Sequence, residues 1–343
     1  MKTERPGKDE GVHAAPFNNL AIMRFRPVFF ALISLFYAAV LGGCGGSPNP
    51  PALQSPAASR NLPQGSSGDL LYVNSTTGNG FIFSYPSGQF ITEFTIASGV
   101  TAWGACADSS GDVFITVEVN STTSSIYEYA HGATTPSAIL NDNGYVATAC
   151  ASDPTTGNLA VVSADESASG KDNVAIYAHA TGEPTRYYDS KVTFQFCDYD
   201  DSGNLFADGS GKHQLAELPS GGKSFKNIPL DKELIMPGGI VWDGSDLAIE
   251  YASFSPKYSG IDRVELAGGK GKIVDSIDLK DLANRTASFA LEDGTLIEAG
   301  GQTLNEVGLW NYPAGGKIVK LFRAKGASGQ TFYGLALSVS PAH

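Results

Sequence analysis

From Asp69 onward, short apolar segments alternate with polar turns at a regular interval. A tight turn of the kind Tyr-Pro-Ser-Gly recurs along this region at spacings of 41 to 48 residues. Its six copies begin at Tyr85, Tyr129, Tyr177, Leu218, Leu266 and Tyr312. Repeats of about 40 to 50 residues are typical of arrays of small β-sheets. Each repeat therefore predicts one sheet of four strands, which we name A to D in chain order.

Two further segments recur within each repeat. An acidic turn leads into an apolar strand, and a short apolar strand precedes that turn. The acidic turns begin at Asp108, Asp153, Asp201, Asp243 and Asp293. Aspartate favours turns because its side chain accepts hydrogen bonds from nearby backbone, and the glycine that follows tolerates a positive φ. The segment before the turn is thus predicted as strand A, and the segment after it as strand B.

The two ends of the repeat region complement each other. Residues 69–96 contain strands B, C and D without a preceding strand A, whereas residues 331–338 form a strand A with nothing after it. Joining the two ends in one composite sheet closes a ring and removes an exposed sheet edge. The sequence therefore predicts an all-β fold, a six-bladed β-propeller over residues 69–341, in which the C-terminal strand completes the first blade.

This pattern resembles that of the NHL-repeat and gluconolactonase-like six-bladed propellers over most of the chain after residue 68. The resemblance rests on repeat spacing and strand order, so it bears on fold more than on activity. It implies, for members that are enzymes, a divalent cation, often calcium, held at the channel mouth by carboxylates and asparagines. The A strands here begin instead with Thr101, Tyr145, Thr193, Met236, Thr286 and Thr331.

None of these six residues is acidic, which disfavours that chemistry. Asp198 and Glu292 are the only carboxylates predicted inside A strands, and calcium prefers about six to eight oxygen ligands. A gluconolactonase-like, metal-dependent hydrolase or lyase, with calcium held mainly by loops, is therefore kept as the alternative function.

Propeller geometry predicts where binding residues lie. The A–B and C–D turns lie on one face, and the B–C and D–A connections lie on the other. The first set is expected to be short and the second longer and more variable, and binding residues usually lie on variable loops. The candidate binding residues on this face are Trp103, Tyr145, Gln195, Ser288 and Tyr333. The expected partner is a protein, a glycan or an envelope polymer, bound without catalysis and without a cofactor.

The N-terminal region has the pattern of an export signal. Arg24 and Arg26 precede an apolar run over residues 28–41, which has the length of a signal-peptide apolar region and is short for a membrane span. Leu41-Gly42-Gly43-Cys44 follows and resembles the bacterial lipobox, which implies cleavage before Cys44 and a lipid on its thiol. The alternative is a transmembrane or buried helix that ends in a chance cysteine.

The flanking segments favour the lipobox. Residues 45–68 are rich in Pro, Ser and Gly and are expected to form a disordered tether. Residues 1–44 would then be the signal peptide, with Met23 as the more conventional start because acidic residues precede it. The sequence thus predicts a monomer anchored to the membrane by Cys44, extracytoplasmic in a bacterial cell envelope, and in the outer membrane if the cell has one.

Composition narrows the classes of function. The 343 residues include 23 Lys and Arg against 35 Asp and Glu, a net charge of −12, which disfavours a nucleic-acid binder. No zinc site is expected, because His131 and His179 lie at hairpin tips where sister repeats carry Ser or Ala. No Ser-His-carboxylate set is visible in the sequence, so triad hydrolysis is not expected.

Three cysteines recur at nearly the same place in three successive A strands, namely Cys106, Cys150 and Cys197. An exported chain favours disulfides. Inner strands of neighbouring blades are nevertheless expected to lie too far apart for the Cα separation of about 5.5 Å that a disulfide prefers. The three residues are therefore expected to be small buried thiols, and a disulfide is the alternative.

Overall fold

The computed structural model describes most of residues 68–340, with internal gaps at 165–171, 190, 253–258, 282–287, 301–304 and 325–329. The predicted signal peptide with Cys44 lies outside the described residues, as does the predicted tether apart from Gly68. Within the described part, no helix is both long enough and apolar enough to cross a membrane.

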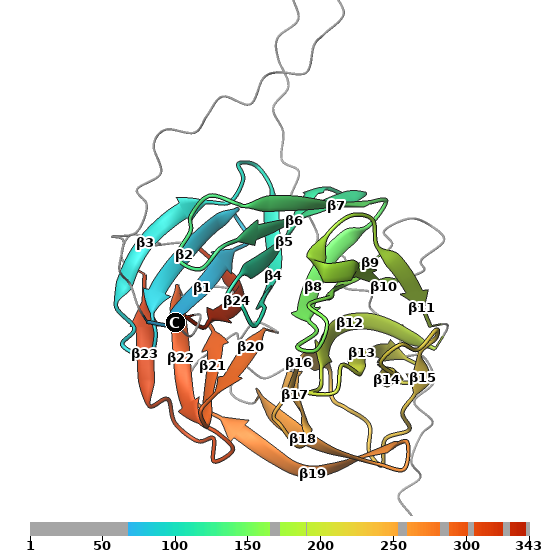
Figure 1. Cartoon of the computed structure of the whole chain (residues 1–343). Coiled ribbons are helices and arrows are strands. Elements are labelled where there is room, and N and C mark those ends of the chain that lie inside the picture. The colour runs from blue at the N-terminus through green and yellow to red at the C-terminus, as the bar shows by residue number, and fades with distance from the viewer. Residues whose placement is uncertain are drawn as a thin grey trace, which may run out of the picture. The chain divides into compact units, whose positions relative to one another are not determined.

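The described strands form six four-stranded antiparallel sheets, arranged as the blades of a ring (Figure 1). Blade 1 contains β24 (Phe332–Ser338), β1 (Leu70–Ser75), β2 (Asn79–Ser84) and β3 (Phe90–Thr95); blade 2 contains β4 (Thr101–Ala107), β5 (Val113–Asn120), β6 (Thr123–Tyr129) and β7 (Ala138–Asn143); blade 3 contains β8 (Val146–Ser152), β9 (Leu159–Ala164), β10 (Asn173–Tyr177) and β11 (Thr185–Tyr188), with the short 3-10 helix η1 (Ala178–Ala180) before β11.

The second half of the ring repeats the arrangement. Blade 4 contains β12 (Val192–Tyr199), β13 (Leu205–Gly211), β14 (Leu215–Leu218) and β15 (Lys226–Asn227); blade 5 contains β16 (Pro237–Trp242), β17 (Leu247–Ala252), β18 (Ser259–Ala267) and β19 (Lys270–Leu279); blade 6 contains β20 (Phe289–Glu292), β21 (Thr295–Ala299), β22 (Glu306–Asn311) and β23 (Lys320–Arg323). The predicted all-β, six-bladed propeller is confirmed.

The ring closes through the C-terminal strand. β24 pairs antiparallel with β1, with Leu335 opposite Val73 and Leu337 opposite Leu71, and the two strands lie side by side in Figure 1. Beyond the strand, the backbone N–H of Ser340 donates to the Asp69 carboxylate at 2.9 Å. The predicted composite blade is therefore confirmed.

The recurring acidic turns owe their shape to one side chain. The Asp108 carboxylate accepts backbone N–H groups from Ser110 and Asp112, each at 2.9 Å. Equivalent bonds define the turns at Asp153, Asp200 and Asp243. In blade 4 this turn begins at Asp200, one residue before the predicted position. Such self-capping turns join strands A and B tightly and hold the inner strands in register.

The core of the ring lies between blades. The described residues form six buried apolar clusters, each built from two adjacent blades. Strand alternation explains this arrangement. In β1, Leu71 and Val73 pack toward blade 6, whereas Leu70 and Tyr72 pack toward blade 2. Each blade is thus stabilised by both neighbours, and the closing strand contributes to two of the clusters.

The expectation that all three A-strand cysteines are thiols is wrong for two of them. Cys106 of β4 and Cys150 of β8 form a disulfide, with their Cα atoms 5.7 Å apart. Cys106 lies two residues before its turn aspartate, whereas Cys150 lies three before, so alternation directs the two side chains toward each other across the interface of blades 2 and 3. Because the two cysteines differ by one residue in their distance from the turn, the Sγ atoms of Cys106 and Cys150 come within bonding distance.

The third cysteine remains a thiol. Cys197 of β12 is buried and packs at the interface of blades 3 and 4. Like Cys150, it lies three residues before its turn aspartate and therefore points toward the preceding blade. The residue of blade 3 in the position that matches Cys106 is Ala151, which packs in the same cluster. Cys197 therefore has no second sulfur opposite it.

Loop lengths differ from the sequence expectation. The sequence predicts short C–D connections, but they span residues 130–137 in blade 2, 178–184 in blade 3 and 312–319 in blade 6. Conversely, the B–C connection of blade 2 consists only of residues 121–122. The two faces are thus more alike in loop length than predicted. Loop length does not distinguish a binding face, so the exposed and aromatic side chains of each face must do so.

Candidate binding face and central channel

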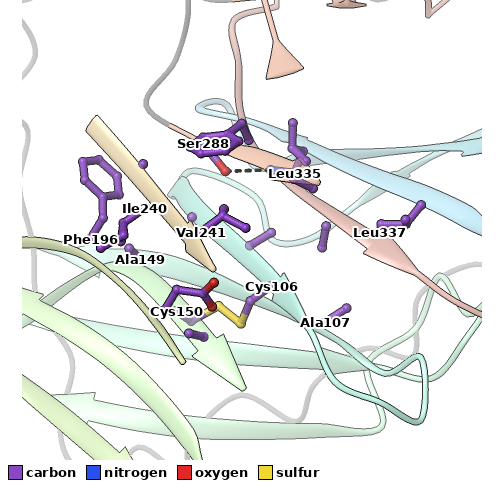
Figure 2. Close-up of a pocket in the computed structure, with 18 of the residues that line it drawn as sticks. Cys106, Ala107, Ala149, Cys150, Phe196, Ile240, Val241, Ser288, Leu335 and Leu337 are labelled. Carbon is purple, nitrogen blue, oxygen red and sulfur yellow. Dashed lines mark hydrogen bonds between the residues drawn. A yellow bond between two sulfur atoms is a disulfide. The ribbon is translucent and has the colours of Figure 1, made fainter. Parts of the chain in front are cut away.

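The six A strands surround a central channel. It contains a cavity of about 250 Å³, lined by residues of β4, β8, β12, β16, β20 and β24 (Figure 2). Because each A strand runs from the B–C and D–A face toward its A–B turn, the channel has two distinct ends. Ser288 and Tyr333 line the first end, and Asp198 and Glu292 line the second.

Two of the predicted binding residues form an aromatic pair on neighbouring inner strands. The rings of Trp103 on β4 and Tyr333 on β24 meet edge to face, with their centroids 5.1 Å apart. The Trp103 indole N–H donates to the Glu118 carboxylate at 3.0 Å, which fixes the ring. Both aromatic side chains are half-buried. A preorganised pair of this kind can contact a ligand at low cost in side-chain entropy.

Ser288 contacts the same inner strand, β24. Its hydroxyl accepts the backbone N–H of Leu335 at 3.4 Å, the contact drawn as a dashed line in Figure 2. Burial, with a smaller contribution from the negative charge of Glu250, raises the pKa of the Tyr333 hydroxyl. That hydroxyl therefore stays protonated at neutral pH and can donate a hydrogen bond. Trp103, Ser288 and Tyr333 are thus all placed around β24.

The other two predicted residues are placed differently. Tyr145 contacts the outer strand of blade 3: its hydroxyl lies 3.1 Å from that of Tyr188, and the Arg186 guanidinium lies 4.1 Å from its ring centroid. Gln195 lies on β12 with an exposed side chain. Tyr145 is therefore engaged with the rim of blade 3, away from the aromatic pair, and Gln195 is open to solvent.

The structure adds two apolar residues to this face that the sequence reasoning missed. Ile235 and Met236, in the D–A connection between blades 4 and 5, expose 63% and 38% of their surface. The Gln214 side chain holds this connection, because its amide both donates to and accepts from the backbone of Leu234 at 2.8 Å. The exposed pair is thus presented by an anchored backbone.

Buried carboxylates lie behind the same end of the channel. Asp208 on β13 is fully buried, and neither carboxyl oxygen has a hydrogen-bond partner of normal geometry in the described part of the chain. Glu250 on β17 is also buried, and Gly238 leaves room for it, since a Cβ there would lie 2.9 Å from its Oε2. Both occupy B strands, which the sequence reasoning did not search for functional groups.

Asp208 predicts an unusual dependence of stability on pH. Burial, and secondarily the charge of Glu250, raise the pKa of Asp208 well above its ordinary value, while the Phe196 backbone amide opposes them. Between its pKa values in the unfolded and folded chain, Asp208 is therefore protonated in the folded chain and ionised in the unfolded one. Stability should fall by about 1.4 kcal/mol per pH unit between the unfolded and folded pKa values of this group.

We therefore expect Asp208→Asn to stabilise the protein at alkaline pH. Asparagine has nearly the same shape and no proton to lose, so the melting temperature should rise by several degrees at pH 8 and change little at pH 4. Thermal melts of the full chain across this range check the effect. Asp275→Asn, at an exposed position on β19, is the control. A melting temperature lowered at pH 8 would contradict a raised pKa of Asp208.

The described residues do not form a metal site. No three His, Cys, Asp or Glu side chains in that part of the chain come together in a way that could hold a metal ion. The calcium site implied by the gluconolactonase-like alternative would need about six to eight oxygen ligands. The described side chains do not supply that set, and we derive no catalytic step through calcium.

Comparison with known proteins supports the fold at low sequence identity. No protein-family model matches the chain, and no curated protein matches it either. Among solved structures, it is similar to a protein of unknown function from Bacteroides caccae, with 12% identity over 79% of this chain and 99% of the other and a TM-score of 0.56. TolB from Acinetobacter baumannii shares 13% identity over 81% of this chain and 68% of its own, with a TM-score of 0.57.

A third solved structure has a similar fold. The major allergen Mala s 1 of Malassezia sympodialis is 14% identical over 67% of this chain and 83% of its own, with a TM-score of 0.51. At these identities the comparisons show the shared fold and leave activity open. The resemblance to NHL-repeat and gluconolactonase-like propellers therefore stays a prediction.

Proposed function

We propose that this chain is a lipid-anchored propeller of the bacterial cell envelope that binds a protein, glycan or envelope polymer without catalysis. Binding takes place on the face that carries the B–C and D–A connections. The main observation in support of this proposal is the Trp103–Tyr333 pair. These two half-buried aromatic side chains contact each other edge to face at the end of the channel. Aromatic anchors of this kind dominate binding energy at many interfaces.

The exposed apolar residues of the same face support this assignment. Ile235 and Met236 are held out from the D–A connection by the Gln214 contact with Leu234. The backbone of Met236 has a φ of 48°, a conformation that costs a non-glycine residue free energy. A strained backbone that presents apolar side chains to solvent is more readily explained by contact with a partner than by stability.

The disulfide supports an extracytoplasmic location. Disulfides persist in oxidising compartments and are rare in the reducing cytosol. The Cys106–Cys150 bond is thus what we expect of a chain exported through the signal peptide and lipobox over residues 1–44. The lipid on Cys44 would tether the propeller to the membrane, and the segment over residues 45–68 would set its reach.

We expect Trp103→Ala and Tyr333→Ala each to weaken partner binding at least tenfold. Truncation removes a large, rigid contact surface, and losses of about 2 kcal/mol or more are usual for aromatic anchors. The measurement is the amount of partner retained from detergent-solubilised envelopes by the tagged full chain, with melting temperatures recorded for every variant. Undiminished capture by both variants would contradict the proposed site.

The control for this experiment is His179→Ala. His179 is exposed at a C–D turn on the opposite face, and its Nδ1 lies 2.9 Å from the Thr156 carbonyl within the same blade, so its loss should leave capture and ring closure unchanged. His131 is unsuitable because its Nδ1 lies 2.7 Å from the Ser338 hydroxyl of the closing strand. Loss of capture at an unchanged melting temperature supports a binding site. A large drop in melting temperature assigns Trp103 and Tyr333 to packing between blades.

A further inference from the structure

The Trp103 side of the aromatic pair comes from a β-bulge. The register between β4 and β5 shifts at this point, so that Trp103 and Gly104 of β4 together oppose the single residue Thr116 of β5. A bulge disrupts the ladder locally and re-aims a side chain, and bulges are frequent next to functional sites. In this bulge the buried Thr116 hydroxyl donates to the Gly104 carbonyl at 3.2 Å. A side chain of blade 2 thus holds the backbone directly after Trp103.

The Tyr333 side of the pair has the same construction. Tyr333 and Gly334 of the closing strand β24 together oppose the single residue Asn74 of β1. Asn74 is fully buried, and its Nδ2 donates to the Trp103 carbonyl in the neighbouring blade at 2.7 Å. Asn74 therefore connects the bulge that carries Tyr333 to the bulge that carries Trp103.

Glycine at the second position of each bulge makes this close approach possible. A Cβ on Gly334 would overlap both Asn74 Oδ1 and the Trp103 carbonyl oxygen. A Cβ on Gly104 would lie 2.7 Å from the Thr148 carbonyl oxygen of β8. Inner strands of neighbouring blades therefore pack backbone to backbone at this level, and the hydrogen bond between Asn74 and Trp103 depends on the absence of a side chain at Gly334.

Stability alone does not explain an asparagine at position 74. The Asn74 Oδ1 atom is buried and has no hydrogen-bond partner among the described residues. A buried polar atom without a partner lowers the free energy of unfolding. An apolar side chain would avoid this cost but could not donate to the Trp103 carbonyl. The contact with Trp103 is therefore the feature of Asn74 that an apolar residue could not replace.

We propose that Asn74 and Thr116 are positioning residues for the aromatic pair. They hold two successive carbonyl groups of β4, those of Trp103 and Gly104, while the Glu118 carboxylate holds the indole N–H at 3.0 Å. Trp103 is thus fixed at both its backbone and its ring before a partner arrives. The inference rests on the proposed partner face and adds how that face is preorganised. Preorganisation strengthens binding because it lowers the cost of ordering side chains.

The test measures the order of Trp103 in the full chain in detergent, in a Trp242→Phe background. The chain has three tryptophans and Trp310 is fully buried, so acrylamide then reaches Trp103 alone. We expect Asn74→Ala and Thr116→Val each to raise acrylamide quenching of Trp103 and to weaken partner capture about fivefold. Thr116→Ser keeps the hydroxyl and should restore both values.

Asn204→Ala is the matched control. The Asn204 side chain accepts the Ser220 backbone N–H at 3.0 Å between two turns of blade 4, on the opposite face. Its loss should lower the melting temperature and change neither quenching nor capture. Unchanged quenching in both Asn74→Ala and Thr116→Val would overturn the proposal, as would an equal loss of capture in Asn204→Ala.

The quenching measurement needs no partner, so it separates this inference from the proposed function. If Trp103→Ala leaves capture intact, the partner face fails, and raised quenching in Asn74→Ala still supports the hold of Asn74 on Trp103. If Trp103→Ala lowers capture while Asn74→Ala and Thr116→Val do not, the partner face stands and the positioning role is overturned.

Discussion

A chain that ends at Gln330 should lose cooperative unfolding and aggregate, because it lacks the strand that closes the ring. Phe332 and Leu335 of β24 are buried between blades 1 and 6, and burial of two such side chains contributes roughly 3–6 kcal/mol. The whole stability of a domain is usually about 5–15 kcal/mol. Removal of β24 would also expose the backbone edge of β1, and an exposed strand edge can pair with other chains.

The matched control is a chain that ends at Ser340. It keeps β24 and the hydrogen bond from the Ser340 backbone to Asp69, so it should melt as the full chain does. Circular dichroism melts and size-exclusion chromatography compare the two. A cooperative melt of the shorter chain at the temperature of the control would contradict closure of the ring by β24.

Cys44→Ser should abolish acylation and leave the precursor uncleaved. The lipobox chemistry requires a thiol to carry the diacylglyceryl group, and a hydroxyl does not replace it. The measurement is metabolic labelling with a fatty-acid analogue, together with the electrophoretic mobility of the precursor. The expected effect is complete loss of label rather than a partial decrease.

Cys197→Ser supplies the control for general effects of cysteine loss. Cys197 is a buried thiol within the propeller, so this variant should be acylated and processed as the wild type is. Label retained in Cys44→Ser would contradict the lipobox. Label lost in both variants would point to a folding or export defect and not to the acceptor cysteine.

The fold was predictable because its repeats are local. Each blade contains a recurring turn that can be recognised in the sequence. In the turn at Asp108, for example, the aspartate side chain accepts hydrogen bonds from two backbone N–H groups. The first blade lacks a strand A before residue 69, and an extra strand A lies at residues 331–338. This count predicts that the two ends pair and close a ring, and β24 does pair with β1. Repeat spacing and strand order were therefore enough to predict the architecture, and no knowledge of side-chain contacts was needed.

Contacts between blades were harder to predict because they depend on register. The cysteine assignment failed on a single residue: Cys106 stands two positions before its turn aspartate and Cys150 three. Counting from the turn aspartate, rather than from the start of the strand, would have shown that the two side chains point at each other. Cys197 shares the position of Cys150, and the same count gives it Ala151 as its neighbour.

The candidate site was partly predictable for the same reason. Trp103, Ser288 and Tyr333 lie at the starts of inner strands, which the repeat alignment locates, and the structure places all three around β24. Ile235 was missed because its exposure depends on a contact between Gln214 and the backbone of Leu234, which no local pattern reveals. Asp208 was missed because a buried, unpaired carboxylate contradicts the usual pattern of a strand.

Site-specific photo-crosslinking in living cells tests the binding face most directly. A photoreactive residue would replace Ile235 on the face with the B–C and D–A connections, or Val319 on the C–D side of blade 6; these positions are 63% and 56% exposed. Similar exposure makes the two probes equally able to report a neighbour. Our account predicts a discrete high-mass adduct at Ile235 that Trp103→Ala removes, and none at Val319. An adduct at Val319 alone, or equal adducts at both positions, would contradict it.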